Sequence, residues 1–342
     1  MKLLSICADA LTMSGIAMAS ETDYSSFDRD IEALVSGRLA DHTGPNLSGY
    51  VQVIYENSGD ITVGGNDLGG FDIHRARLSM TGERQGYGYK VQVDFAATPV
   101  LKDAYVDVPV ADHSVRAGLF QPMISRNGVN SSSKLFFIDR SEIGNLFDER
   151  DAGAMLSAHF DQIALFICLL NGTDGQGDEL KTAIRVAFNF LGAGVGKVEG
   201  AYGGPDELAG TAAVAMYDDG NTTDGTATLI EAHVANSQYS AGVELFDADA
   251  MGVSAAAGAS LAVDDATAMT LYGTYMLTPD QWELGVRFQD MDDADDTTVT
   301  EVGINHYIDG HNLKYAIGYR SIGSDNAGLE ADIIQVQLTC AF

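Results

Sequence analysis

Basic residues and cysteines are scarce in this chain. Its 342 residues contain 19 Lys and Arg against 49 Asp and Glu, which gives a formal net charge of −30. A charge of this sign and size excludes a protein that binds nucleic acid or an anionic surface through its overall electrostatics. Two of the three cysteines, Cys168 and Cys340, fall in predicted strands far apart in the sequence. A disulfide framework is therefore not expected.

Long hydrophobic runs are also missing after the N-terminal segment. The most apolar window, 163–170, has only eight residues, far fewer than the ~18 of a membrane-spanning helix. If the chain crosses a membrane it must do so as closed β-structure, because only helices and closed barrels satisfy their backbone groups in lipid. Many Gly, Ala, Thr, Tyr and Phe with only 6 Pro favour strands joined by turns.

Residues 1–19 have the parts of a secretory signal peptide. Lys2 supplies a positive charge, a mostly apolar run covers 3–18, and the small residues at 17 and 19 suit a cleavage site. Asp9 interrupts the apolar run, so a soluble N-terminus is the alternative. We expect this segment to direct export.

Residues 20–46 are predicted to form a periplasmic N-terminal segment before a barrel at 47–342. Phe27, Ile31 and Leu34 recur at helical spacing there. The segment is therefore interpreted as a short amphipathic helix, with a disordered leader as the alternative.

The last nine residues alternate strictly between two kinds of side chain. Every second position is apolar, namely Ile334, Val336, Leu338, Cys340 and Phe342. This period puts the apolar and the polar sets on opposite faces of a strand. A soluble sandwich can end in this way, but a final strand that ends on an aromatic residue is typical of outer-membrane barrels. In those proteins the apolar face meets lipid and the polar face meets a water-filled lumen.

The alternation predicts sixteen strands. They are expected near 47–57, 71–84, 87–97, 100–108, 113–120, 151–160, 163–171, 181–190, 195–203, 226–236, 239–248, 266–277, 281–291, 297–308, 311–323 and 330–342. Short turns such as Gln85-Gly86 and Asp161-Gln162 alternate with longer connections, as in outer-membrane barrels with both ends in the periplasm. Residues 209–217 and 252–263 also look strand-like and would give eighteen strands, but we interpret them as hairpins within loops.

Charged residues alternate with apolar ones inside several strands. In 281–291, for example, Glu283 and Arg287 oppose Leu284 and Val286. If the apolar set faces lipid, the charged set lines the interior; in a soluble sandwich it would face solvent instead. Sixteen strands in one sheet favour a pore wide enough for water. The fold class predicted is an all-β transmembrane antiparallel barrel.

A series of motifs resembles the phosphate-selective porin O and P family in order along the mature chain. They are Arg75-Ala76-Arg77-Leu78, Tyr89 to Phe95, Leu101 to Tyr105, Ala117 to Pro122, Asp139-Arg140-Ser141, Arg150 to Gly153, Asn171-Gly172, Glu231, Glu244, Leu277-Thr278, Trp282-Glu283-Leu284 with Arg287, Asn305-His306-Tyr307 and Ala341-Phe342. The resemblance implies a sixteen-stranded, trimeric barrel in the Gram-negative outer membrane. It also implies that the long segment after Gln121-Pro122 folds into the lumen as a constriction loop.

The candidate constriction residues carry both signs of charge. Wall candidates are Arg75, Arg77, Lys90 and Arg116, and loop candidates are Arg126, Lys134, Arg140, Asp139, Glu142 and Asp148. Connections of about thirty residues are unusual in compact folds and are often functional. Opposed charges in a narrow lumen would orient polar solutes, and rings of one sign set ion preference. The alternative role for each basic residue is a salt bridge that anchors the loop to the wall.

Three hypotheses for function follow. The first is a passive porin for ions and small hydrophilic solutes, for which the acidic composition favours cations or little preference. The second is an anion or phosphate porin, which the basic cluster at 75–150 and the resemblance favour. The departure from the family is that Lys and Arg are few, with none between residues 198 and 286. The third is a structural or adhesive barrel whose loops plug its lumen.

No catalytic residue or cofactor is predicted. The seven His residues are scattered, and no hydrolase or metal-binding motif contains them. The acidic run with Asp292, Asp293, Asp295 and Asp296 lacks the central Gly and terminal Glu of an EF-hand. We interpret it as a solvated external loop, with weak divalent bridging to lipopolysaccharide as the alternative. The expected partners are outer-membrane lipid, lipopolysaccharide, further copies of the chain and small solutes.

Overall fold

A computed structural model describes the chain from residue 44 onward, with several short gaps. The described residues are 44–63, 66–96, 98–172, 180–218, 220, 225–249, 267–293 and 295–342. Three predicted features lie outside this part: the signal peptide at 1–19, almost all of the N-terminal segment at 20–46, and the strand-like residues 252–263. None of the helices in it is long and apolar enough to cross a membrane.

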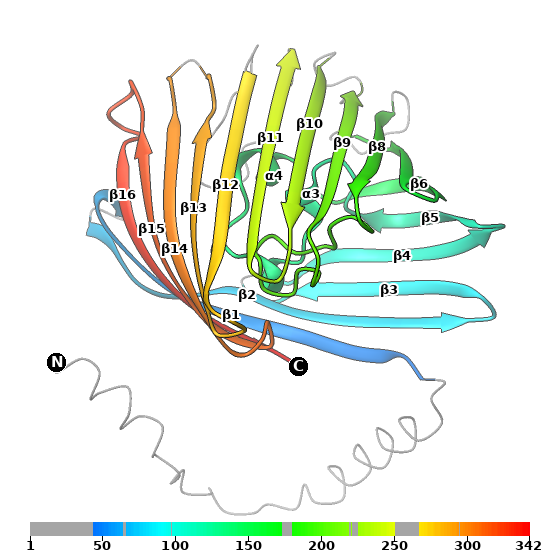
Figure 1. Cartoon of the computed structure of the whole chain (residues 1–342), viewed down its shortest axis with the longest axis horizontal. Helices are drawn as coiled ribbons and strands as arrows, with labels where there is room; N and C mark the ends of the chain where they lie inside the picture. The colour runs from blue at the N-terminus through cyan, green and yellow to red at the C-terminus, as the bar shows by residue number, and fades with distance from the viewer. Residues whose placement is uncertain are drawn as a thin grey trace, which may run out of the picture. The chain divides into compact units, whose positions relative to one another are not determined.

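Sixteen antiparallel strands form one closed barrel, as the alternation predicted (Figure 1). Their bounds are β1 Asn46–Val63, β2 Asn66–Arg84, β3 Tyr87–Asp94, β4 Val100–Val110, β5 His113–Phe120, β6 Asp151–Phe160, β7 Ile163–Leu170, β8 Lys181–Leu191, β9 Ala209–Asp218, β10 Thr226–Ala235, β11 Tyr239–Asp249, β12 Thr267–Thr278, β13 Trp282–Asp290, β14 Thr298–Asp309, β15 Leu313–Gly323 and β16 Ala331–Ala341. Each strand pairs with the next along the chain. The barrel closes where β1 meets β16, with Tyr50 opposite Ala341, so neither strand is left as an open edge.

The two faces of the wall differ as the period-two pattern predicted. On β16, Ile334 is 51% exposed on the outer face, whereas the side chain of Gln337 is 2% exposed on the inner face. On β13, Val286 is 53% exposed and Glu283 is fully buried. The outer surface is therefore apolar and the polar side chains point inward, which is the arrangement that a lipid surround requires.

Short turns join most strands at the end of the barrel that holds the C-terminus. At the predicted turn between β2 and β3, Gln85 and Gly86 have φ values of 52° and 86°. Positive φ at both central residues is characteristic of the tight hairpin turns whose twist matches the flanking strands. Asp161 and Asp280 have φ values of 47° and 59° in the equivalent turns. These predicted turns are confirmed.

Two predictions in the middle of the chain are wrong. Residues 195–203, predicted as the ninth strand, belong to no strand, and 209–217, interpreted as a loop hairpin, form β9. Residues 192–208 contain six glycines and one proline. Ordering glycine in a strand costs much backbone conformational entropy, and proline lacks the N–H donor that pairing with a neighbouring strand requires. The two errors cancel, so the count of sixteen is correct. The connection between β8 and β9 therefore spans 192–208.

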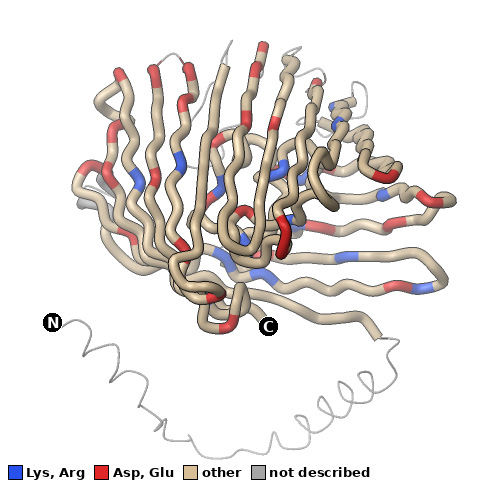
Figure 2. Tube along the Cα trace, viewed as in Figure 1, with Lys and Arg blue, Asp and Glu red and all other residues tan. Residues whose placement is uncertain are grey.

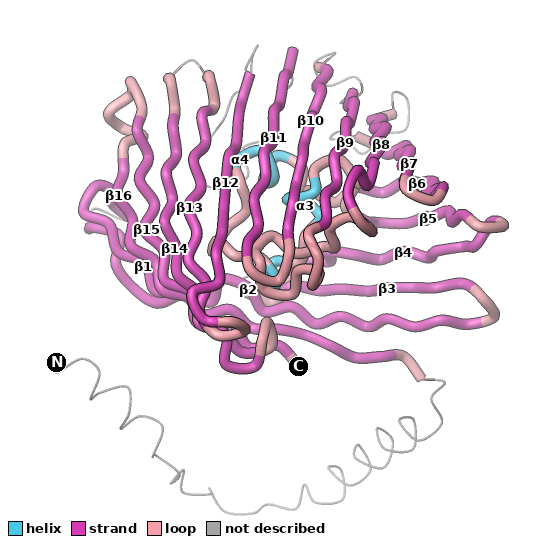
Figure 3. The backbone as a smooth tube through the Cα atoms, in the orientation of Figure 1, coloured by secondary structure: helices cyan, strands magenta, loops and turns pink. Residues whose placement is uncertain are grey.

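The connection between β5 and β6 is the only one in the described residues with helices. It contains α3 (Arg126–Val129), a 3-10 turn (η1, Ser132–Lys134) and α4 (Glu142–Leu146). The Ser125 and Ser141 side chains accept hydrogen bonds from backbone amides in the first turns of α3 and α4, as N-cap residues do. Figure 3 shows these helices among the strands rather than outside the wall.

Candidate functional site

The β5–β6 connection lies inside the barrel. The Gln52 side chain of β1 donates a hydrogen bond to the carbonyl oxygen of Ser132 at 3.1 Å. From β8, nearly opposite β1 in the barrel, Arg185 donates to the carbonyl oxygen of Ile124 at 2.6 Å. Because both wall side chains point inward, the segment 121–150 crosses the lumen. We call this segment the constriction loop.

An apolar cluster fixes one side of the constriction loop against the wall. Phe120, Ile124, Ile143 and Phe147 of the loop region are at most 4% exposed and pack against inward-facing residues of β6 to β12, among them Leu170, Leu229 and Phe246. Full burial of one such side chain stabilises a fold by about 1.5–3 kcal/mol. The loop is therefore held by its own core on the β6–β12 side of the lumen.

A polar cavity remains on the opposite side, between the constriction loop and strands β1 to β6. Its volume is about 300 Å³. The charged side chains that line it are seven basic ones and one acidic one, namely Arg77, Lys90, Arg116, Lys134, Arg140, Arg150, Lys197 and Asp103. A second cavity, of about 590 Å³, adjoins it, because Arg150 lines both. We call the smaller cavity the basic cavity.

Carboxylates neutralise most of the basic side chains in this cavity. Lys90 lies 2.5 Å from Asp103, and Arg116 lies 2.8 Å from Asp107. Further ion pairs are Arg77–Asp94 at 2.7 Å, Arg150–Asp148 at 2.7 Å and Arg140–Asp148 at 3.5 Å. The Arg116 guanidinium also lies over the Tyr105 ring, 3.7 Å from its centroid. Such contacts fix the direction of each charge.

Lys134 and Lys197 differ from the other basic residues of the cavity. Within the described part of the chain, neither has a carboxylate within 4.0 Å. Desolvation in the lumen lowers the pKa of Lys197, and the charges of Arg116, Lys90 and Arg126 lower it further. Both lysines are exposed and unpaired in this part of the chain, so they are available to a passing solute.

Other predicted site residues anchor the constriction loop and do not line the basic cavity. Arg75 lies 3.1 Å from Asp139, and His74 lies 3.2 Å from the same carboxylate. Glu142 is paired with Arg320 of β15 at 2.5 Å. For these groups the structure agrees with the alternative that we left open, a salt bridge between loop and wall.

The sequence of the whole barrel matches a known family. A family model described as phosphate-selective porin O and P matches residues 51–342. The chain belongs to this family. It is an outer-membrane porin, as the resemblance implied. No curated protein matches the chain.

Solved porin structures share the fold of this porin at low sequence identity. The OmpT outer-membrane protein of Vibrio cholerae, in its trimer form, has a TM-score of 0.60 and 12% identity, with 87% of this chain and 99% of OmpT covered. A mutant of the Rh. blastica porin has a TM-score of 0.59 and 15% identity, covering 87% of this chain and all of that chain, 100%. At such identities the likeness concerns the fold alone.

Three charged residues of the basic cavity were not among the predicted constriction residues of this porin. Asp103 and Arg150 lie in motifs that the sequence analysis used only for the resemblance. Lys197 was missed because 195–203 was predicted as a strand, and no local pattern reveals that this segment enters the lumen. Arg126, by contrast, was among the predicted constriction residues. Its guanidinium is occupied by hydrogen bonds that it donates to the backbone carbonyls of Val195, Gly196 and Val198.

The acidic run between β13 and β14 is hydrogen-bonded within itself and to the β15–β16 connection, where Ser324 and Asp325 donate to the carbonyl oxygen of Asp295. Asp293 accepts hydrogen bonds from the backbone amides of Asp295 at 3.3 Å and Thr297 at 2.8 Å. Across the described ranges, no three His, Cys, Asp or Glu side chains are placed to hold a metal ion. Asp292 and Asp296 have positive φ values of 43° and 45°, as turn residues do.

Proposed function

We propose that this porin is a passive channel with weak charge selectivity, in which ions and small hydrophilic solutes pass through the basic cavity. The observation that carries the proposal is that five of the seven basic side chains lining the cavity are paired with carboxylates. Paired charges orient a polar solute as it passes but present little net charge to it. The constriction residues are those that line this cavity, and Arg75, Asp139 and Glu142 hold the loop.

A preference for anions is the second candidate. Lys134 and Lys197 support it, because an unpaired ammonium group attracts anions in a narrow lumen with low-dielectric walls. The acidic strand ends act against it. Figure 2 shows Asp and Glu at the upper ends of several strands from β9 to β16, and Asp218, Asp249 and Asp290 end three of them.

The remaining parts of the proposal concern assembly and export. A homotrimer is supported by the trimer form of the similar Vibrio cholerae protein. The exposed apolar belt would contact lipid and lipopolysaccharide. Residues 1–19 would direct export, and residues 20–46 would lie in the periplasm. The protein would act as a channel and not as an enzyme.

The reversal potential of single channels in a potassium chloride gradient tests the proposal. A value near zero supports weak selectivity. A strong anion potential together with block of chloride current by phosphate would support the second candidate and overturn the first. Absence of conductance from folded protein would overturn both and support a structural barrel.

A further inference from the structure

The connection between β8 and β9 is long at an end of the barrel where the other connections are short. Residues 192–208 separate these strands, whereas two or three residues form the other turns at this end, namely 85–86, 111–112, 161–162, 236–238, 279–281 and 310–312. In outer-membrane barrels the periplasmic connections are the short ones. We call residues 192–208 the periplasmic segment.

The periplasmic segment enters the lumen. Ser240 of β11 donates a hydrogen bond from its hydroxyl to the carbonyl oxygen of Glu199 at 2.7 Å. The backbone amide of Ala201 donates to Glu283 of β13 at 2.6 Å and to Thr274 of β12 at 3.1 Å. All three wall side chains point inward, and Glu199 and Ala201 are fully buried.

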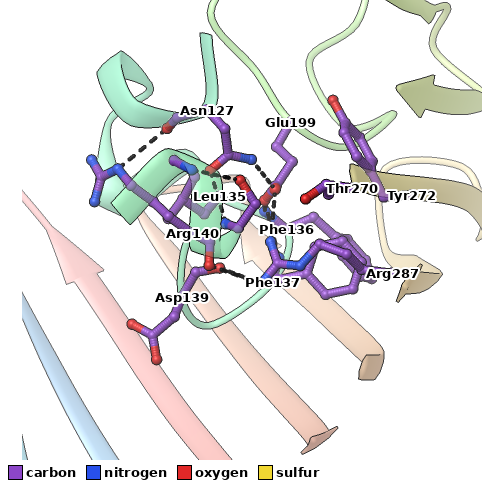
Figure 4. A network of polar contacts seen from close by, with 12 residues as sticks. Asn127, Leu135, Phe136, Phe137, Asp139, Arg140, Glu199, Thr270, Tyr272 and Arg287 are labelled. Carbon is purple, nitrogen blue, oxygen red and sulfur yellow. Dashed lines mark hydrogen bonds and ion pairs between the residues drawn. The ribbon is translucent and has the colours of Figure 1, made fainter. Parts of the chain in front are cut away.

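Glu199 binds the constriction loop at two places. One carboxylate oxygen accepts hydrogen bonds from the backbone amides of Phe136 at 2.8 Å and Phe137 at 3.2 Å. The other accepts from the side chain of Asn127 in α3 at 2.7 Å. Figure 4 shows the carboxylate between these groups, with Arg287 on its other side. Hydrogen bonds to an ionised acceptor are about twice as strong as neutral ones.

The constriction loop also binds the periplasmic segment through Arg126. Arg126 at the start of α3 donates hydrogen bonds to the carbonyl oxygens of Val195, Gly196 and Val198. The same stretch of backbone, residues 195–198, places Lys197 in the lining of the basic cavity. The periplasmic segment therefore supplies both a clamp and part of the constriction.

These contacts close the side of the lumen along β12 to β15. Inward-facing polar side chains of β12 to β15 are almost completely buried beneath the two segments, although in an open barrel they would line water. The exposed fractions of the whole residues are 0% for Thr270, 0% for Glu283, 1% for Arg287, 0% for Gln289, 1% for Asn305 and 2% for Lys314. On the opposite wall, the side chains of Lys90 and Arg116 keep 25% exposure.

We propose that Glu199 is a positioning residue for the constriction of this porin. Through it the periplasmic segment holds the constriction loop from the end of the barrel with the short turns. It closes the side of the lumen along β12 to β15, so that solutes pass only along the β1–β6 wall. The inference rests on the proposed function, because it assigns the solute path of that same channel.

The first test compares the variants Glu199→Ala and Glu199→Gln with Glu207→Ala. Glu207 is an exposed carboxylate of the same segment with no hydrogen bond in the described structure, so its removal is a matched control. In planar bilayers, Glu199→Ala is expected to raise open-channel current noise and conductance, because the loop loses its clamp. Glu199→Gln keeps one oxygen acceptor and is expected to lie between Glu199→Ala and wild type. Glu207→Ala is expected to match wild type.

The second test replaces residues 193–207 with an Asn-Gly turn. Strands β8 and β9 already pair as far as Leu191 and Gly210, so a short turn can join them. Conductance is expected to rise on the order of twofold, since the closed side of the lumen along β12 to β15 becomes part of the conducting cross-section. A difference in gel migration between unheated and heated samples identifies folded barrels.

The outcomes separate this inference from the proposed function. If wild type conducts and both Glu199→Ala and the shortened protein match it, the inference fails alone. If wild type does not conduct, the proposed function fails, and conductance that appears in the variants still supports closure by the periplasmic segment. If the shortened protein does not fold, the noise of Glu199→Ala decides.

Discussion

Glu199 and Arg287 form an ion pair in which both side chains are 0% exposed, with 3.3 Å between carboxylate and guanidinium. They are 88 residues apart in the sequence. Arg287 also pairs with Glu301 at 2.5 Å and donates hydrogen bonds to the carbonyl oxygens of Asp139 and Arg140 at 3.0 Å each. One guanidinium on β13 therefore joins the wall, the constriction loop and the periplasmic segment.

Removal of this guanidinium is expected to destabilise the barrel strongly. In Arg287→Met the carboxylates of Glu199 and Glu301 lose their buried partner, and breaking a buried pair in this way costs about 3–5 kcal/mol. Urea unfolding from lipid vesicles measures the change. Arg84→Met is the control, because Arg84 is exposed at the end of β2. Equal unfolding midpoints for the two variants would contradict the prediction.

Strand placement could be predicted from the sequence because it depends on local alternation. Residues 334–342 and 281–291 show this, since lipid outside and polar groups inside impose a period of two on each strand. The exchange of 195–203 for 209–217 shows the limit of the method. Glycine-rich sequence can alternate by chance, and β9 is rich in alanine, which marks neither face clearly.

The constriction could be predicted only in part. The family resemblance and the length of 121–150 identified the loop, but which of its charged residues anchor it depends on partners such as Arg320 that lie far away in the sequence. The periplasmic segment was out of reach, because the contacts of Glu199 with Phe136 and Arg287 are entirely tertiary. No local pattern encodes them.

Asp103 is expected to limit the anion preference of the basic cavity. It lies 2.5 Å from Lys90 and 3.5 Å from Arg150, so one carboxylate offsets two cations. In Asp103→Asn, Lys90 loses its partner and Arg150 keeps only Asp148, so the reversal potential is expected to move toward the anion side. Asp72→Asn, on an exposed carboxylate of β2, is the control. A shift of equal size in the control would show that long-range charge is responsible.

Lys134 and Lys197 are expected to act in the opposite direction. The double variant Lys134→Gln/Lys197→Gln removes the two ammonium groups of the cavity that have no ion-pair partner in the described structure. The reversal potential should therefore move toward the cation side, without loss of folded protein, because no buried pair is broken. Arg84→Gln removes a basic charge outside the cavity and should leave the potential unchanged. If the double variant also leaves it unchanged, neither lysine contacts permeating ions.

Anchoring of the constriction loop through Asp139 is expected to persist in mild acid. Burial alone would raise the pKa of Asp139, but the hydrogen bond from His74 and the charges of His74, Arg75 and Arg320 lower it well below its usual value. A carboxyl group with a lowered folded-state pKa stabilises the folded state above its unfolded pKa of 3.8. That contribution is lost only as the pH falls through the lower, folded value.

Open-channel noise should therefore stay constant from about pH 7 to about pH 4 and increase only in stronger acid. Asp139→Asn removes the ion pair with Arg75 at every pH, so its noise should already be raised at neutral pH. Single-channel recordings across this range measure both effects, with Asp72→Asn as the control for lost charge. If the noise of wild type already rises at a pH well above the unfolded pKa, another group holds the loop, because Asp139 remains ionised at that pH.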